Sequence, residues 1–241
     1  MSDIAKKMIL CPRCHRTAYF TIWNSINTKT DPQTFELARD LSLFRFHCPY
    51  CKQTTLLNYS FLYHQMESSL FIYYVPEDED TEAVQQILDT IRNGPQSGTA
   101  AGEKAVSGED RLLVNALSGY KCRIVRTHKD FLEKLAIFDA GLDDRLVELT
   151  KYTLSAQAEQ QLAGYGFRVK GASFLFNRET GEKQLVYQDK NSNRTATVSF
   201  DRPVANVYNQ LSSRYGAILD GPRKQDTVID RDWAAGLVKE V

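Results

Sequence analysis

The chain has 241 residues, of which 42% are hydrophobic, and it is long enough to bury one large core or two small ones. No stretch reaches the roughly 18 consecutive apolar residues that a membrane-spanning helix needs, and residues 1–10 lack the apolar region of a signal peptide. We therefore expect a cytoplasmic protein with no membrane partner. Thirty basic residues balance thirty acidic ones, so only a local basic patch could attract nucleic acid.

Four of the five cysteines form two C-P-x-C pairs, Cys11 with Cys14 and Cys48 with Cys51. One C-x-x-C turn supplies two thiolates, so two such turns supply the four ligands of a tetrahedral ion. Because the cytoplasm keeps thiols reduced, the paired motifs favour a metal over a disulfide. The sequence predicts one structural Zn²⁺ ion at these four cysteines, and the same ligands also suit iron.

Sequences typical of β-strands follow both cysteine pairs. Residues 17–23 and 52–63 are rich in β-branched and aromatic residues, and residues 69–75 supply a third such segment. They predict three antiparallel strands with the metal site at one end, the architecture of a zinc ribbon. A thioredoxin-like C-x-x-C instead precedes a helix, whose N-terminus lowers the pKa of the attacking thiol. Thiol–disulfide chemistry at the second pair is therefore the less favoured interpretation.

The residue after each second cysteine is His15 in the first motif and Lys52 in the second. Metal-binding turns often place Gly there, because the backbone favours a positive φ. The sequence therefore predicts either a less tightly wound turn or a strained one. Arg13, Arg16 and these two residues could offset the charge of a zinc–tetrathiolate site, or they are solvated surface groups. His15 and His47 are alternative metal ligands, but four cysteines make them unnecessary.

Helical patterns flank the three predicted strands. Residues 31–43 open with Asp and Pro, which are typical of a helix start, and place apolar residues for packing on the ribbon. The acidic residues 77–80 precede an apolar helical pattern at 83–91, where negative charge stabilises a helix N-terminus. Residues 93–108 are rich in Gly, Ser, Ala and Pro and are predicted to be a linker or loop.

Two further helices are predicted after this segment. The first begins at Thr127 or His128, and the second begins at Asp143 or Asp144. The three carboxylates within residues 139–144 could hold a divalent cation or act as acid and base. Helix capping explains them more simply.

The fifth cysteine, Cys122, stands apart from both pairs. We interpret it as a small buried residue. The alternative is a reactive thiol, because Lys121 and Arg123 beside it would favour a thiolate.

The C-terminal part of the sequence, from residue 153, alternates helical and β-type patterns. A helix is predicted first, then strands joined by hairpin-like turns, then two more helical segments. Their residue ranges are 155–164 for the first helix, 167–169, 173–177, 184–188 and 194–200 for the strands, and 203–216 and 230–241 for the last helices. A meander with helices on one face makes a compact α+β domain.

Aromatic residues on the predicted strands have two interpretations. One set could stack nucleic acid bases, but we interpret it as core: Phe174, Phe176, Tyr187 and Phe200. A second set comprises candidate anchors for a protein partner, with burial in the protein's own core as the alternative: Tyr59, Tyr63, Tyr73 and Tyr74.

Several motifs together resemble the bacterial and archaeal CpXC domain family over roughly residues 8–152. They are CPRC, CPYC, FLYHQM, FIYYVP and the run RIVRTHKDFLEKLAIFDAGLDDRLVELTKY. The resemblance implies a shared fold and a metal site at Cys11, Cys14, Cys48 and Cys51. The family is described as functionally uncharacterised, so the resemblance implies no reaction and no catalytic residue.

We therefore predict an α+β protein with four parts. Residues 1–92 form a three-stranded zinc-ribbon-like domain with accessory helices, residues 93–110 a linker, residues 111–152 a helical part that completes the CpXC-like region, and residues 153–241 an α+β meander domain. Four thiolates leave a zinc ion no open position for water, so we favour a non-enzymatic interaction or adaptor protein with a protein partner. A nucleic-acid-binding zinc ribbon and a thiol–disulfide redox protein are the alternatives.

Overall fold

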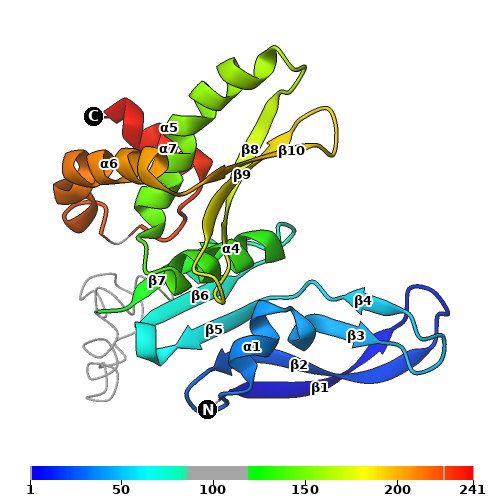
Figure 1. The fold of residues 1–241 in the computed structure, drawn as a ribbon. Helices are drawn as coiled ribbons and strands as arrows, with labels where there is room; N and C mark the ends of the chain where they lie inside the picture. The colour runs from blue at the N-terminus through cyan, green and yellow to red at the C-terminus, as the bar shows by residue number, and fades with distance from the viewer. Residues whose placement is uncertain (1, 83, 86–118, 225, 241) are drawn as a thin grey trace. The chain divides into compact units, whose positions relative to one another are not determined.

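The computed structural model describes residues 2–82, 84–85, 119–224 and 226–240. Its internal contacts divide the chain into two compact units, Met1–His128 and Lys129–Val241 (Figure 1). The predicted linker at 93–110 lies outside the described residues. The assignment of residues 111–152 and 153–241 to separate functional parts stays a prediction. In the described part of the chain, no helix has the length and apolar character needed to cross a bilayer.

A five-stranded sheet forms the centre of the first unit, in the order β1-β2-β5-β6-β7. Its strands are β1 (Asp3–Leu10), β2 (Thr17–Asn27), β5 (Phe61–Gln65), β6 (Leu70–Tyr74) and β7 (Lys121–Val125). The β1–β2 and β5–β6 pairs are antiparallel, whereas β2–β5 and β6–β7 are parallel. The mixed α+β fold is thus confirmed. The predicted segments 17–23, 52–63 and 69–75 contribute β2, β5 and β6, but these do not form a three-stranded antiparallel ribbon, because β2 and β5 are parallel.

A second, smaller hairpin follows β2. It consists of β3 (Arg45–His47) and β4 (Thr54–Leu56), and it is preceded by α1 (Thr34–Arg39) and the 3₁₀ turn η1 (Ser42–Phe44). The predicted helix at 31–43 is therefore shorter than expected. It ends early because Leu41 adopts a left-handed conformation with φ of 62°, which a continuing right-handed helix cannot contain.

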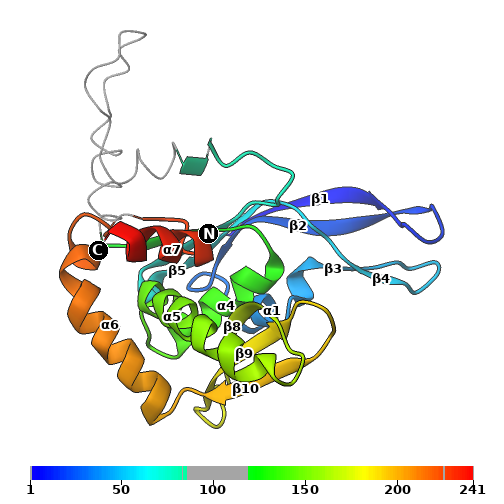
Figure 2. The same ribbon diagram turned by 90° about the horizontal axis from the view of Figure 1, so that it is seen from above.

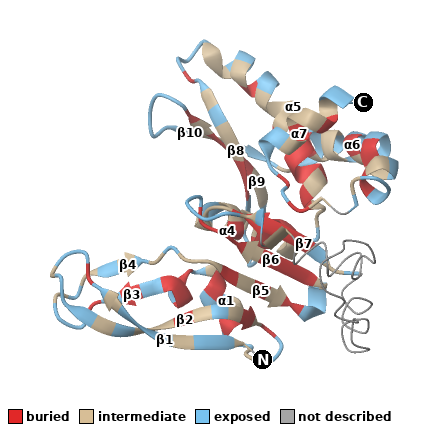
Figure 3. Ribbon diagram, turned by 180° about the vertical axis from the view of Figure 1, so that it is seen from behind, coloured by how far each residue is buried: buried red, intermediate tan, exposed pale blue. Residues whose placement is uncertain are grey.

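Stacked aromatic rings fill the core of the first unit. Phe44 stacks on Phe61 with 4.4 Å between ring centroids, and Phe61 stacks on Tyr74 at 4.9 Å. Tyr63 and Tyr74 are buried, so these two candidate anchors belong to the protein's own core. Figure 3 shows burial on β5, β6 and β7, whereas β1 is mostly exposed and β2 mostly intermediate.

The second unit is a three-stranded antiparallel sheet with helices packed beside it. The sheet order is β10-β9-β8, and α5 packs against β8 on one side and against α6 and α7 on the other (Figure 2). The elements are α4 (His128–Asp139), α5 (Asp144–Ala163), β8 (Val169–Phe176), β9 (Lys183–Asp189), β10 (Thr195–Ser199), α6 (Arg202–Asp220) and α7 (Arg231–Glu240). The structure thus has the predicted meander at 167–200, with two expected short strands joined in β8.

Helix α5 runs without interruption through Ser155, where the sequence predicted the start of a new helix. The Ser155 hydroxyl donates to the carbonyl of Lys151, 2.6 Å away and one turn earlier. Serine can bond its own helix in this way as well as cap a new one. The cap pattern at Ser155 was therefore misinterpreted.

The aromatic residues of the second sheet lie in the core. Phe174 and Tyr187 are buried, and the ring of Phe200 meets Phe174 edge to face at 5.7 Å. Phe176 and Phe200 are partly buried against the same cluster. The interpretation of these four residues as core is thus confirmed.

Ion pairs fix α4 to α5 inside the second unit. The Lys134 ammonium contacts the Asp144 carboxylate at 2.8 Å, and both side chains are buried. The Lys151 ammonium contacts the carboxylates of Glu133 and Glu148, each at 2.7 Å. Although burial alone would lower it, these two carboxylates raise the pKa of Lys151, so the lysine is charged.

The acidic segment at 139–144 belongs to this structural network. Asp143 caps α5, because its carboxylate accepts the N–H of Arg145 at 2.9 Å. Asp144 is the buried partner of Lys134. The capping interpretation is thus confirmed for Asp143, and the buried ion pair explains Asp144.

Candidate metal centre

The four paired cysteines lie on two hairpin turns. Cys11 and Cys14 occupy the turn from β1 to β2, and Cys48 and Cys51 occupy the turn from β3 to β4. Both views show the two hairpins extending side by side with their tips at the same end (Figures 1 and 2). Cysteines at least 34 positions apart in sequence are thereby brought to one place.

The two turns have the same backbone hydrogen bonds. In the first, the Cys11 N–H donates to the carbonyl of Arg16 at 2.9 Å, and the His15 N–H donates to the carbonyl of Cys11 at 3.0 Å. The second turn repeats both bonds at the equivalent positions, again at 2.9 and 3.0 Å. Each turn therefore presents its two sulfurs in the same local geometry.

His15 and Lys52 have φ angles of 56° and 61°. The strained alternative is thus the observed one, because both turns are tightly wound without a glycine. A left-handed conformation costs a residue with a Cβ about 1–2 kcal/mol. The chain tolerates this strain once in each turn.

This strain predicts that Lys52→Gly stabilises the protein by about 0.5–1 kcal/mol, because glycine accepts a positive φ. The measurement is urea unfolding of the metal-loaded protein, with metal content determined in parallel. Gln53→Gly is the matched control, since its φ is not positive; it should destabilise by about 0.5–1 kcal/mol. Equal destabilisation by both substitutions would contradict the expectation.

The four cysteine sulfurs form one compact group, in which all Sγ atoms lie within 4.8 Å of one another. Sγ of Cys11 is 3.6 Å from Sγ of Cys51, and Sγ of Cys14 is 3.6 Å from Sγ of Cys48. A tetrahedral ion with Zn–S bonds of about 2.3 Å spaces its sulfurs about 3.8 Å apart. The sulfur positions therefore fit a tetrahedral metal ion.

Backbone N–H groups stabilise negative charge at the first cysteine of each pair. The N–H of Cys51, followed by that of Tyr50, lowers the pKa of Cys48 to about 6 against the opposing effect of burial. The N–H of Cys14 likewise lowers the pKa of Cys11. For Cys14, the N–H of Arg16 lowers the pKa, but burial and the neighbouring thiols outweigh it and raise the value to about 11. Cys11 and Cys48 are thus the more readily ionised thiols, and a bound cation would favour the thiolate form of Cys14.

An apolar cluster supports the sulfurs from one side. Cys11 and Cys48 are buried together with Phe46, and Phe20 of β2 meets Phe46 edge to face at 6.0 Å. This packing fixes the two turns and excludes water from that side of the group. Phe46 could not be singled out from the sequence, because β3 is only three residues long.

The two histidines near the motifs do not join the group. Among the described residues, the metal-compatible cluster around these turns consists of the four cysteines alone. His47 instead bonds through Nδ1 to the Thr54 hydroxyl at 3.0 Å. The structure thus brings together all four predicted cysteines without His15 or His47.

Cys122 lies on β7, away from this group. Its side chain is buried in an apolar cluster with Phe71, Val75 and Ile124. This environment agrees with the interpretation of a small core residue, since reactive thiols are partly exposed.

The family model described as "CpXC protein" matches residues 9–151. No curated protein matches the chain, and neither does any solved structure.

Proposed function

Since the chain belongs to the CpXC family, whose function is unknown, we propose from its geometry that it is a structural metal-binding protein. In this proposal the two hairpins form a zinc-ribbon-like unit in which Cys11, Cys14, Cys48 and Cys51 bind one Zn²⁺ ion. The observation that carries it is the group of four sulfurs within 4.8 Å on two matching turns. Four thiolates complete the tetrahedron, so the ion would stabilise the hairpins and leave no open position for a reacting water.

The proposal is tested by elemental analysis of protein purified without affinity metals. We expect about one equivalent of metal per chain, with zinc in excess of iron. Cobalt substitution provides a second measure, because tetrahedral thiolate ligation gives Co²⁺ characteristic visible absorption. Absence of metal together with a reversible disulfide in either pair would favour the thiol–disulfide alternative.

An exposed apolar face supports a role in binding a protein partner. Met8 and Tyr19 lie directly opposite each other on the β1–β2 hairpin and are 58% and 74% exposed. Ile4 and Leu10 are also exposed and share the face of Met8, because alternate residues of a strand point the same way. Strand β1 is an edge strand of the sheet. Exposed apolar side chains on a sheet edge are typical of interaction surfaces.

A nucleic acid partner is the second candidate, favoured by the charges around the cysteine turns. Residues 4–30 contain five lysine or arginine residues and no acidic residue. Residues 41–66 contain two basic residues and likewise no acidic residue. The chain as a whole is neutral, so this basic character is local. The positive charge of these basic residues would outweigh the formal charge of minus two on a zinc–tetrathiolate site. Phosphate binding through such a patch weakens as salt increases.

Two double variants distinguish these candidates. For a protein partner, Met8→Gln with Tyr19→Gln should reduce the partner recovered with the tagged protein by at least about tenfold, because buried aromatic anchors carry most of an interface's energy. Arg13→Gln with Lys52→Gln should leave that recovery unchanged, and nuclease treatment should not alter it. The reverse pattern, with nuclease-sensitive recovery that falls between about 50 and 200 mM salt, identifies nucleic acid. Circular dichroism and metal content show whether each variant is folded.

A further inference from the structure

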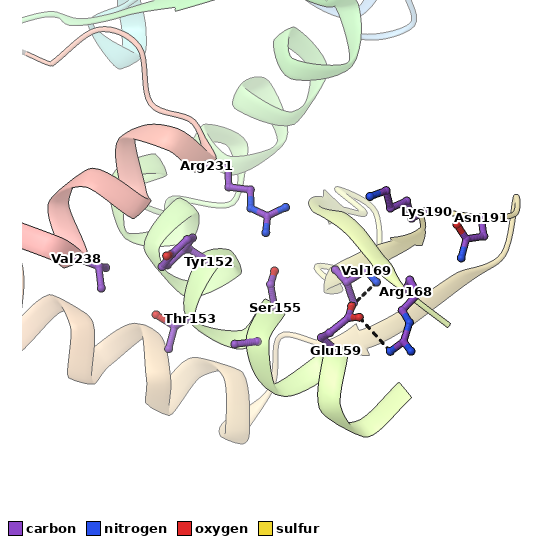
Figure 4. Close-up of a pocket in the computed structure, with 11 residues that line it drawn as sticks. Tyr152, Thr153, Ser155, Glu159, Arg168, Val169, Lys190, Asn191, Arg231 and Val238 are labelled. Carbon is purple, nitrogen blue, oxygen red and sulfur yellow. Dashed lines mark hydrogen bonds and ion pairs between the residues drawn. The ribbon is translucent and has the colours of Figure 1, made fainter. Parts of the chain in front are cut away.

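A hollow of about 740 Å³ opens in the second unit (Figure 4). Its walls come from α5, from the start of β8, from the residues after β9 and from α7. Small-molecule sites are typically hollows of about 300–1,000 Å³. All lining residues fall within 152–238, outside the matched range 9–151. The hollow is therefore lined by other residues than the cysteine centre and lies outside the part of the sequence that the family model matches.

The charges of the hollow are unbalanced in favour of cations. Arg168, Lys190 and Arg231 line it together with one carboxylate, that of Glu159. The Glu159 carboxylate is already engaged, because it accepts the N–H of Val169 and contacts the Arg168 guanidinium at 3.5 Å. Among the described residues, Lys190 and Arg231 have no carboxylate partner within ion-pair distance. Two positive charges thus remain for a ligand.

Hydrogen bonds to the backbone hold the Arg231 guanidinium and the main chain of Lys190 in place. One Nη of Arg231 donates to the carbonyl of Lys170 at 3.1 Å, which orients the guanidinium and leaves its other N–H groups for a ligand. The N–H of Lys190 donates to the carbonyl of Arg168 at 2.7 Å. The turn after Lys190 is fixed by the buried Asp189, whose carboxylate accepts the N–H of Asn191 at 3.4 Å. A guanidinium oriented in this way loses less entropy on binding.

The opposite end of the hollow is apolar. Tyr152 and Val238 lie at the end away from Lys190 and Asn191, and Arg231 lies between the two ends (Figure 4). Val169 adds a further apolar wall. The arrangement fits a ligand with a dianionic group at one end and a small apolar group at the other.

We propose that this hollow binds a small organic phosphate. The phosphate lies between the Arg231 guanidinium and the Lys190 ammonium, which are suited to a dianion. The organic group lies against Tyr152 and Val238. This inference is independent of the proposed metal centre, because the residues of the hollow belong to the second unit and the cysteine turns to the first.

The test is a titration of the full-length, metal-loaded protein with phenyl phosphate, followed by calorimetry and by amide chemical shifts at constant ionic strength. We expect saturable binding with shifts at residues 152–156, 168–170 and 190–191. Arg231→Gln and Lys190→Gln should each weaken binding about tenfold, since charge-assisted hydrogen bonds to phosphate are lost. Lys239→Gln is the matched control, because Lys239 is exposed on the same helix as Arg231 and does not line the hollow.

Glu159→Gln should change the affinity for phenyl phosphate in the opposite direction to Arg231→Gln and Lys190→Gln. The amide oxygen can still accept the Val169 N–H, whereas the negative charge that engages Arg168 is removed. Binding of phenyl phosphate should strengthen several-fold, because a third cation becomes available. Inorganic phosphate serves as the second probe: weaker binding than phenyl phosphate identifies a phosphate ester as the ligand, and equal binding identifies free phosphate.

Three results would overturn the proposal. One is a titration that does not saturate with either probe. Another is equal weakening by Lys239→Gln and by the two hollow variants, which would indicate unspecific charge attraction. The third is a set of chemical shift changes outside the hollow. Lys190 and Arg231 are both exposed, so a folded variant should be obtained for at least one of them.

Discussion

Cys48→Ser is expected to abolish metal binding and to disorder the hairpin of β3 and β4. The substitution removes one of four ligands and leaves three sulfurs with an incomplete tetrahedron. Structural zinc contributes on the order of 10 kcal/mol to small domains. Because β3 and β4 are only three residues each, this hairpin has little other stabilisation of its own.

The measurement combines elemental analysis with amide hydrogen exchange. Metal content should fall from about one equivalent to near zero, and exchange protection should be lost at β3, β4 and the two cysteine turns. Protection should persist in β5, β6 and β7, whose core contains the stacked rings of Phe61 and Tyr74. The effect is therefore local to the hairpins.

Cys122→Ala is the matched control for this experiment. It also removes a buried thiol, but from the apolar cluster on β7. It should lower stability by about 1 kcal/mol through lost packing and should retain the full metal content. Full metal content in Cys48→Ser, or loss of metal in Cys122→Ala, would refute the four-cysteine site.

Lys151→Met should destabilise the second unit by about 3–5 kcal/mol, because it leaves two buried carboxylates without their cation. Glu133 and Glu148 each contact the Lys151 ammonium at 2.7 Å. Glu133 also accepts the N–H of Phe174 at 2.8 Å, so the lost charge affects the contact between α4 and β8. Methionine keeps the volume of the lysine stem, so the change tests charge rather than packing.

Glu148→Gln is the contrasting variant and should be nearly neutral or slightly stabilising at pH 7. Burial raises the pKa of Glu148 above its ordinary value, although Lys151 opposes the shift. A carboxyl group with a raised pKa in the folded state stabilises most below its ordinary pKa, and this stabilisation is lost as pH rises through the folded value. The amide removes that pH dependence, while Lys151 retains Glu133 as its partner.

Both variants are measured by urea unfolding in a Trp23→Phe background, followed by the fluorescence of Trp233, which lies in α7 of the same unit. The wild-type protein should lose more stability than Glu148→Gln as pH rises above about 4.5, since only the wild type carries the titrating carboxyl. Equal destabilisation by Lys151→Met and Glu148→Gln would show that packing, and not charge, governs this cluster. Metal content should be unchanged in both.

The cysteine group could be predicted from sequence because its determinants are local. Each C-P-x-C motif specifies a turn by itself, and two such turns have few ways to combine other than around an ion. The meander of the second unit was also predictable, because its strands are consecutive and joined by short turns. Tyr187 and Phe174 followed the alternation expected of a sheet with one buried face.

The sheet of the first unit was less predictable because its pairing is non-local. The parallel pairs β2–β5 and β6–β7 join segments far apart in the chain, and no short turn encodes such pairing. Strand β1 was missed because most of its residues are exposed, so apolar alternation is weak there. The run of Ile124 and Val125 was the available signal for β7, and both residues are buried.

An ion at the four cysteines would act on the unfolded chain as well as on the folded one. Linking Cys14 to Cys48 closes a loop of 33 residues, and a cross-link of that span removes about 3–4 kcal/mol of chain entropy from the unfolded state. The loop contains α1, whose six residues are too few for a helix that is stable in isolation. A metal ion bound at the hairpin tips thus restricts the conformational freedom of every residue between them. Removal of the ion by a chelator would therefore loosen α1 together with the turns that hold the ion.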